Sequence, residues 1–337
     1  MSEASAQMGV KRAASVVQLR DRTWRITLSV PVGFIGTSQC YVLEDDDDGL
    51  HVVDPGWDLE PNRQVLAEGL ASFGKVTGDV RSVIGSHLHP DHIGLGNWLR
   101  SESGARLVIG RAEQRAIDTF AATPESERLA RHRSSLARWG VPPSAWKELA
   151  EAPVMESLAD VHADTLVDTG DRLDIPGRDV LVVGTPGHTP GSICLKEAAD
   201  NAFFTGDHVL PTVSPAPGTG GSTESNALVD LLSSLSDVTR FDGAEAFPGH
   251  GEPFFGLAAR CAEIAQHHIF RSEEVAAVLE RDRDATVWGL SQAVTWRAGW
   301  NGLADHHKVS ALRQIEMHAA FVSASSDWER VGPSRWK

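Results

Sequence analysis

Short apolar runs separated by turn residues dominate the first 256 positions of the chain. Trp24, Ile26, Leu28 and Val30 alternate with polar residues, and this two-residue period predicts a half-buried strand that begins at Thr23. Further short strands are predicted at 39–43, 50–53, 80–85, 106–109, 179–183, 192–195, 202–204 and 244–247. Helical spacing at 59–73 and 226–235 lies between these strands, which predicts an α/β fold.

Two long stretches have a helical pattern instead. Residues 111–160 are rich in Ala, Glu, Arg and Leu, and two or three helices inserted between strands are expected there. Such an insertion can cover a binding site, or it can pack as a layer on the scaffold or against a second subunit. Residues 257–337 carry apolar side chains at three- and four-residue spacing and are expected to form a helical C-terminal region. Residues 1–20 are expected to be a flexible tail, which leaves 21–256 as the main domain.

The most informative stretch runs from Ser86 to Gly94. It holds His87, His89, Asp91 and His92 directly after a predicted buried strand. A loop that leaves the carboxyl end of a strand can direct several side chains to one point, and imidazole and carboxylate groups are ligands for zinc, iron or manganese. The stretch therefore predicts a metal site rather than a histidine-rich surface turn.

Three later segments repeat the order of strand, glycine-containing turn and ligand: they hold His188, Asp207 and His250. In an α/β sheet, loops that leave the carboxyl ends of strands gather at one edge. Seven potential ligands would meet there, which suits two metal ions with one carboxylate between them. Structural zinc sites are usually closed and four-coordinate. Seven ligands for two ions therefore favour a catalytic centre over a binding protein in which the metal only stabilises the fold.

The composition of the chain limits which partners and which cell compartment are expected. The chain has 31 Lys and Arg against 46 Asp and Glu, and the resulting net charge of −15 disfavours nucleic acid as the main partner. The chain contains no apolar run of about 18 residues, so no membrane span is expected. The N-terminal residues do not resemble a secretory signal, and three isolated cysteines fit a reducing compartment, so a cytoplasmic protein is expected.

Four blocks of residues in this order resemble the metallo-β-lactamase superfamily: H-x-H-x-D-H at 87–92, then G-H-T-P-G, G-D-H and P-G-H-G. The resemblance spans about 23–256 and implies a four-layer αββα sandwich as the catalytic domain, with a helical insertion and a C-terminal helical domain similar to a winged-helix-like tail. It also implies three groups of ligands: His87, His89 and His188 for the first ion, Asp91, His92 and His250 for the second, and Asp207 as the bridge. By the same resemblance, Asp54 lies beside the ligands and supports them.

Differences from two groups of the superfamily narrow the choice of subfamily. β-Lactamases of the commonest class have Cys at the position of Asp207 and Arg at that of His92, and flavodiiron oxidoreductases lack the histidine that is present here as His89. The pattern is more similar to glyoxalase II, quorum-quenching lactonases and metal-dependent thioesterases. The resemblance thus implies two divalent ions, zinc before iron or manganese, and a metal-bridging hydroxide that cleaves a carboxylic ester, thioester or lactone.

Two residues are expected to take part in the chemistry. Asp91 would carry a proton to the leaving group, and His208 would stabilise an oxyanion or support a ligand, although a packing role for His208 is equally open. The substrate is expected to be a small molecule with an acyl or lactone group. The apolar side chains expected to contact it are Phe34, Ile35, Trp57, Trp139 and Trp146.

Three alternatives remain open from the sequence. A phosphodiesterase or nuclease could use the same metal centre, while a β-lactamase and a non-catalytic metal-stapled protein are less favoured. The sequence is also compatible with a homodimer.

Overall fold

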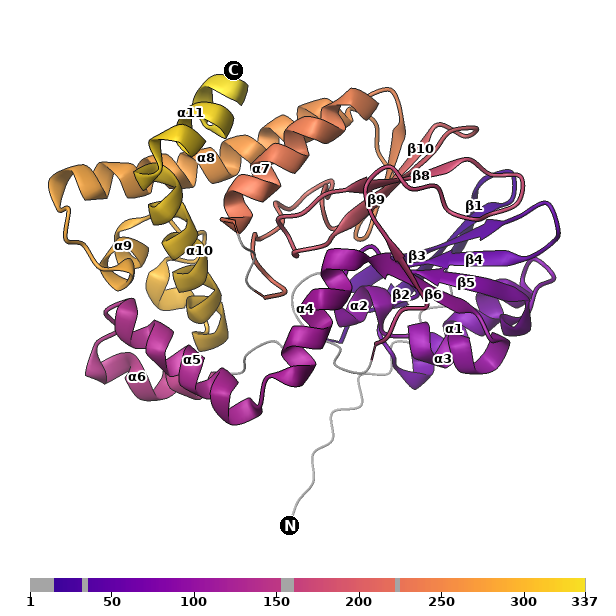
Figure 1. The fold of residues 1–337 in the computed structure, drawn as a ribbon, viewed down its shortest axis with the longest axis horizontal. Helices are drawn as coiled ribbons and strands as arrows, with labels where there is room; N and C mark the ends of the chain where they lie inside the picture. The colour runs from indigo at the N-terminus through magenta and orange to yellow at the C-terminus, as the bar shows by residue number, and fades with distance from the viewer. Residues whose placement is uncertain (1–14, 32–35, 153–160, 222–224, 337) are drawn as a thin grey trace, which may run out of the picture.

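Two β-sheets pack face to face in the computed structural model, which describes residues 15–31, 36–152, 161–221 and 225–336 (Figure 1). The seven-stranded sheet runs in chain order: β1 (Ser15–Arg20), β2 (Thr23–Ser29), β3 (Thr37–Glu44), β4 (Leu50–Val53), β5 (Val80–Ile84), β6 (Arg106–Gly110) and β7 (Thr165–Val167). The four-stranded sheet has the order β11 (Glu245–Pro248), β10 (Ala202–Gly206), β9 (Ile193–Glu197) and β8 (Val180–Gly184).

Alternation along the strands separates two apolar layers. On β3, Tyr41 points into the core between the sheets, where it meets Phe204 and Phe247 of the second sheet, whereas Val42 points to the outer core. The outer core of the first sheet also contains Leu66 of α1 (Glu60–Ala71), together with residues of α3 (Gly96–Ser103). Every residue of β4 is buried because both faces of this strand are covered.

The second sheet is covered by helices on its outer face. Phe203 of β10 shares a core with Leu231 of α7 (Ala227–Val238) and Ile264 of α8 (Leu257–Arg281). The order of layers is thus helix, sheet, sheet, helix, as expected from the sequence. Short helical segments complete the connections: α2 (Pro90–Ile93) and the 3₁₀ turns Thr77–Asp79, Thr239–Phe241, Trp300–Gly302 and Pro333–Trp336.

The expected N-terminal tail is shorter than predicted. Residues 15–20 form β1, which pairs antiparallel with β2 at the edge of the large sheet, so the prediction of a flexible tail through residue 20 is wrong for this part. Every residue of β1 is exposed or half-buried, and for this reason the strand lacks a clear apolar alternation. Residues 1–14 lie outside the described residues.

The insertion forms three helices, α4 (Arg111–Ala122), α5 (Glu125–Arg138) and α6 (Pro143–Ala150), which confirms the helical prediction for 111–150. Residues 153–160 lie outside the described part. Helices α5 and α6 lie beside α9 (Val287–Ala293) and α10 (Asp305–Ser323), away from the sheets (Figure 1). An apolar cluster joins these elements, in which Trp139 and Leu149 share a core with Trp300 and Leu312.

The C-terminal region continues the helical layer. After α10 the chain forms α11 (Ser325–Val331), and no strand follows Pro248 among the residues that the structure describes, so no β-wing accompanies these helices. Phe321 of α10 packs in the same core as Phe203 of the second sheet. The end of α10 therefore joins the outer layer of the sandwich, whereas α9 and the first part of α10 pack with the insertion helices. In the described ranges, no helix combines the length and apolarity needed to cross a membrane.

Candidate metal centre

Five loops bring polar side chains to one edge of the sandwich. Each loop follows the carboxyl end of a strand: β4, β5, β8, β10 or β11. Strands β4 and β5 run parallel in the first sheet, and β10 and β11 run parallel in the second. Strand β8 is antiparallel to β9, which is antiparallel to β10, so β8 and β10 point the same way. This arrangement gathers side chains that are far apart in the sequence.

The structure brings all seven predicted ligands into two neighbouring groups. The first cluster consists of His87, His89, His188 and Asp207, and the second cluster consists of Asp91, His92 and His250. Within each cluster, one donor atom per residue lies within 4.8 Å of the others. Six of the seven residues are buried, and Asp91, with 17% of its side chain exposed, is the most accessible. Both clusters thus have the donor types and the burial of a metal site.

The imidazole nitrogens that face into the clusters have the spacing that a metal ion requires. His89 Nδ1 lies 2.8 Å from His87 Nε2 and 3.2 Å from His188 Nε2, and in the second cluster the Nε2 atoms of His92 and His250 are 3.3 Å apart. Two nitrogens bound tetrahedrally to one zinc ion at 2.0–2.1 Å would lie about 3.3 Å apart. The donor set therefore fits a divalent ion in each cluster.

Asp207 connects the two clusters. Its Oδ1 lies 3.4 Å from the Nε2 atoms of both His92 and His250, and its Oδ2 lies 3.8 Å from His188 Nε2. Although these nitrogens are near, Oδ1 is buried and accepts no hydrogen bond. A buried carboxylate oxygen without a donor is costly, and a cation would satisfy it. The two oxygens of Asp207 are thus placed to bridge two ions.

The opposite ring nitrogens are held by oxygen acceptors. Three of them donate to backbone carbonyls: His89 Nε2 to Thr219 at 3.0 Å, His188 Nδ1 to Ala216 at 2.8 Å, and His250 Nδ1 to Thr37 at 2.6 Å. A proton fixed on the outer nitrogen leaves the lone pair on the inner nitrogen, which is the form that binds a metal. The surroundings therefore set the tautomer of each of these rings.

Asp54 supports two further ligands from behind. Its Oδ2 accepts hydrogen bonds from His92 Nδ1 at 2.9 Å and from Ser86 Oγ at 2.7 Å, and Ser86 Oγ in turn accepts from His87 Nδ1 at 2.9 Å. Its Oδ1 accepts from the backbone N–H of Ser86 at 2.7 Å. A Cβ on Gly206 would lie 2.5 Å from Ser86 Oγ, so the glycine before the bridging aspartate makes room for this network. Asp54 therefore orients one histidine of each cluster.

The charges within the site shift several pKa values. Although burial opposes it, the carboxylates of Asp207, Asp54 and Asp91 raise the pKa of His92 well above its usual range. Burial would lower the pKa of His250, but Asp207 outweighs it and raises that pKa to about 9. Burial would raise the pKa of Asp91, but His92 and His250 outweigh it and lower that pKa to about 2. Without metal, the second cluster therefore carries ion pairs near neutral pH.

In the first cluster, burial outweighs the nearby carboxylates and lowers the pKa values of the histidines. Desolvation and the neighbouring His188 lower the pKa of His89 to about 3, and burial lowers the pKa of His188 as well. Both rings are therefore neutral near pH 7, and neutral imidazole is the form that donates a lone pair to a metal ion.

The other predicted site residues have varied positions. Phe34 and Ile35 lie outside the described residues. Trp57 is half-buried in the loop after β4, three residues beyond Asp54. The structure places Trp139, which is 1% exposed, and Trp146 in the apolar cluster with the C-terminal helices, so a contact between either residue and substrate stays a prediction.

His208 is buried directly after Asp207, and burial lowers its pKa to about 3. Among the described residues, its ring nitrogens make no hydrogen bond to the two clusters. His208 therefore forms no hydrogen bond to the predicted metal ligands, and its role in stabilising an oxyanion stays a prediction.

One residue near the clusters does not stand out in the sequence. Glu113, near the start of α4, is fully buried and accepts hydrogen bonds from the loops that carry His87 and His188. Its position four residues before the buried Ile117 is the available sequence signal, because a charged residue on the buried face of a helix needs partners.

Comparison with known proteins agrees with this geometry. Residues 34–250 match the protein family that is described as the metallo-beta-lactamase superfamily. The probable metallo-hydrolase YqjP of Bacillus subtilis strain 168 is 27% identical over 266 residues, which cover 76% of this chain and 80% of that protein. The lactamase-like protein adaB of Aspergillus niger is 28% identical over 199 residues, which cover 56% of this chain and 60% of that protein.

Solved structures show the same fold. A beta-lactamase domain protein from Burkholderia ambifaria superposes with a TM-score of 0.76 at 25% identity, over 95% of this chain and 92% of that chain. A metallo-beta-lactamase family protein from Thermus thermophilus has a TM-score of 0.73 at 24% identity, over 92% and 95% of the two chains. The matching sequence blocks, the layered fold and the convergent histidines and aspartates lead to one conclusion: the chain belongs to the metallo-beta-lactamase superfamily.

Proposed function

We propose that this superfamily hydrolase holds two divalent metal ions, zinc foremost, and cleaves a carboxylic ester, thioester or lactone. The observation that carries the proposal is the bridging position of Asp207 between two complete clusters. When bound, two such ions lower the pKa of a water molecule to near neutral and polarise the carbonyl that it attacks. The side chains described here would hold the ions, orient the reactants and move a proton.

Each cluster has a distinct part in the proposal. His87, His89 and His188 supply neutral nitrogen donors, whose outer nitrogens are held by fixed acceptors, so these rings need little rearrangement. The second cluster includes Asp91, whose low pKa keeps it ionised near neutral pH. Because Asp91 is ionised and is the most exposed ligand, it would accept the proton that the attacking water gives up and pass it to the leaving oxygen or sulfur.

The residues at two ligand positions favour an acyl substrate over a β-lactam. Asp207 replaces the cysteine, and His92 the arginine, of the commonest β-lactamases that the sequence resembles. Two relatives are called lactamase-like and metallo-hydrolase, and these names support hydrolysis as the reaction class. The half-buried Trp57 lies three residues after Asp54 in the same loop, and its side chain would offer apolar surface to an acyl chain or a lactone ring.

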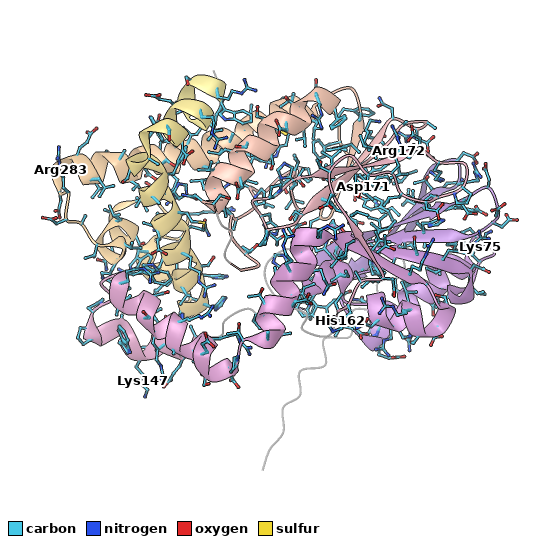
Figure 2. All side chains as sticks on the ribbon, viewed as in Figure 1. Lys75, Lys147, His162, Asp171, Arg172 and Arg283 are labelled. Carbon is cyan, nitrogen blue, oxygen red and sulfur yellow. The ribbon has the colours of Figure 1, made fainter. Side chains whose placement is uncertain are left out.

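Charge argues against a nucleic-acid substrate. In the C-terminal helices, Arg260 pairs with Glu263 and Arg271 with Glu274, so these guanidinium groups are neutralised locally. Lys147 on α6 and Arg283 beyond α8 lie at separate places on the outer edge of the molecule (Figure 2). The net charge of −15 also disfavours binding to a phosphate backbone.

A hydrolysis panel on the zinc-loaded protein tests the proposal. The panel holds an acyl-homoserine lactone, an aryl ester, an acyl-thioester, bis-p-nitrophenyl phosphate and a cephalosporin. Turnover of at least one of the first three, abolished by a chelator and restored by Zn²⁺, is the expected result. Turnover of the phosphodiester alone would replace the proposal with a phosphodiesterase, and turnover of the cephalosporin alone would replace it with a β-lactamase.

A further inference from the structure

A buried carboxylate joins the two loops that carry the first cluster. Glu113 is 0% exposed, and its two oxygens accept different hydrogen bonds. Oε1 accepts from the backbone N–H of Leu88 at 2.7 Å, and Oε2 accepts from the backbone N–H of Gly191 at 2.6 Å. Leu88 lies between two ligands, and Gly191 lies three residues after a third. One side chain therefore connects the loop of His87 and His89 with the loop of His188.

Close backbone packing holds this carboxylate in place. A Cβ on Gly191 would lie 2.1 Å from the backbone nitrogen of Glu113, and a Cβ on Gly110 would lie 2.3 Å from the carbonyl oxygen of Gly191. Real Cβ atoms do not approach other atoms so closely, so both positions require glycine. The first turn of α4 is thus pressed against the loop after His188, which leaves the Glu113 side chain little freedom to move.

The charge of Glu113 is compensated by donors rather than by a cation. Among the described residues, the groups that act on this carboxylate include no Lys, Arg or His. Burial raises the pKa of Glu113 to about 7, while hydrogen bonds from the Thr189 hydroxyl and from the N–H groups of Leu88 and Gly191 oppose the increase. A buried anion with only neutral donors is costly unless positive charge lies nearby. Two divalent ions beyond the ligand loops would supply that charge.

We propose that Glu113 is a positioning residue that locks the loops of His87, His89 and His188 together, so that these three imidazoles converge on the first metal ion. This inference rests on the proposed metal centre. It concerns the first cluster because Glu113 accepts hydrogen bonds from Leu88, Thr189 and Gly191, which all lie next to or near ligands of that cluster. The second cluster is supported separately, through Asp54 at His92 and through the Thr37 carbonyl at His250.

Glu113→Gln tests the lock with little change in shape. A carboxylate accepts at both oxygens, but an amide accepts only at one, so its NH₂ group must face the N–H of Leu88 or of Gly191. Glu113→Asp keeps the charge but is one methylene shorter and cannot reach both loops. The matched control is Glu197→Gln, because Glu197 on β9 is also buried and accepts from a backbone N–H, that of Asp200, away from the ligand loops.

The measurement is a Zn²⁺ titration of the metal-free proteins in competition with a chromophoric chelator. His188→Asn and His250→Asn, each lacking a ligand of one cluster, assign the two binding steps. Glu113→Gln and Glu113→Asp are expected to weaken the step of the first cluster by about 10- to 100-fold, the usual effect of removing a group that supports a ligand. The second step and both steps of Glu197→Gln are expected to stay within about threefold of wild type.

The outcomes separate the inference from the proposed function. Wild-type protein that binds fewer than two Zn²⁺ ions would refute the dinuclear centre itself. Two tight ions in wild type together with unchanged affinities in Glu113→Gln would refute the lock alone, as would equal losses at both steps. If Glu113→Gln does not give a cooperative unfolding transition, Glu113→Asp decides by the same criterion.

Discussion

Replacing Asp54 with asparagine removes one charge from the centre and almost no volume. Asp54 has a φ of 52°, in the left-handed region, which asparagine tolerates better than most residues, so the backbone can keep its conformation. The side chain accepts three hydrogen bonds, two from Ser86 and one from His92. An amide cannot reproduce them, because its NH₂ group must face either the Ser86 N–H or His92 Nδ1.

The two orientations of the amide have different costs. If the NH₂ group faces the Ser86 N–H, a buried hydrogen bond to a charged group is lost, which lowers the free energy of unfolding by about 1.5–3 kcal/mol. If the NH₂ group faces His92 Nδ1, that nitrogen must become the acceptor, and the proton moves to Nε2, where it blocks metal binding. Zinc affinity is then expected to fall by about 10- to 100-fold, which corresponds to about 1.4–2.8 kcal/mol.

The assay combines zinc competition with urea unfolding of the metal-free protein. Asp45→Asn is the matched control, because Asp45 is also buried and its carboxylate accepts from two backbone N–H groups and lies 3.1 Å from His51. It lies in the turn between β3 and β4, at the opposite end of β4 from Asp54. The control is expected to lose stability but to keep its zinc affinity. Asp54→Asn with both zinc affinity and stability equal to wild type would show that the network does not orient the ligands.

Four further predictions follow from the same structure. Asp207→Ala is expected to retain less than one tenth of wild-type hydrolysis and to lose metal, since it removes a bridge; two ions per chain by elemental analysis would contradict this. Trp139→Ala should lower the free energy of urea unfolding by about 3–5 kcal/mol with unchanged zinc content, because this side chain fills the core between the insertion and the C-terminal helices. In metal-free protein, the pKa of about 9 at His250 predicts that protonated His250 stabilises the fold fully below pH about 6.5 and that this stabilisation is lost as the pH rises through 9. The difference in unfolding free energy between wild type and His250→Asn should therefore fall over this range. A difference that does not change with pH would contradict the ion pairs. RNA binding measured against salt should be undetectable near physiological ionic strength, and a steep salt-dependent affinity would revive the nuclease alternative.

The ligands could be predicted from the sequence because each follows a recognisable local signal. A predicted strand, a glycine-containing turn and a histidine or aspartate occur together at His188, Asp207 and His250, and parallel strands bring such positions to one edge. The helices of the insertion and the C-terminal region could also be predicted, since apolar spacing reports which face of a helix is buried. The strand β1 was missed because an exposed edge strand need not alternate.

The partners of these elements could not be predicted. The carbonyls of Ala216, Thr219 and Thr37 orient three ligand rings, but a backbone oxygen leaves no trace in the sequence. Apolar spacing likewise indicates that Trp139 is buried but not which residues it contacts. In the structure, Trp139 packs against the C-terminal helices. Glu113 contacts residues 25 and 78 positions away, so its role depends on the assembled fold.

The most direct test of the central claim is the metal content of the purified protein, measured together with its rate of ester or lactone hydrolysis as Zn²⁺ is added back to metal-free enzyme. The two clusters joined by Asp207 predict that activity rises with bound zinc and reaches its maximum at two ions per chain. Full activity with one ion per chain, or activity that persists in metal-free protein, would contradict the dinuclear centre.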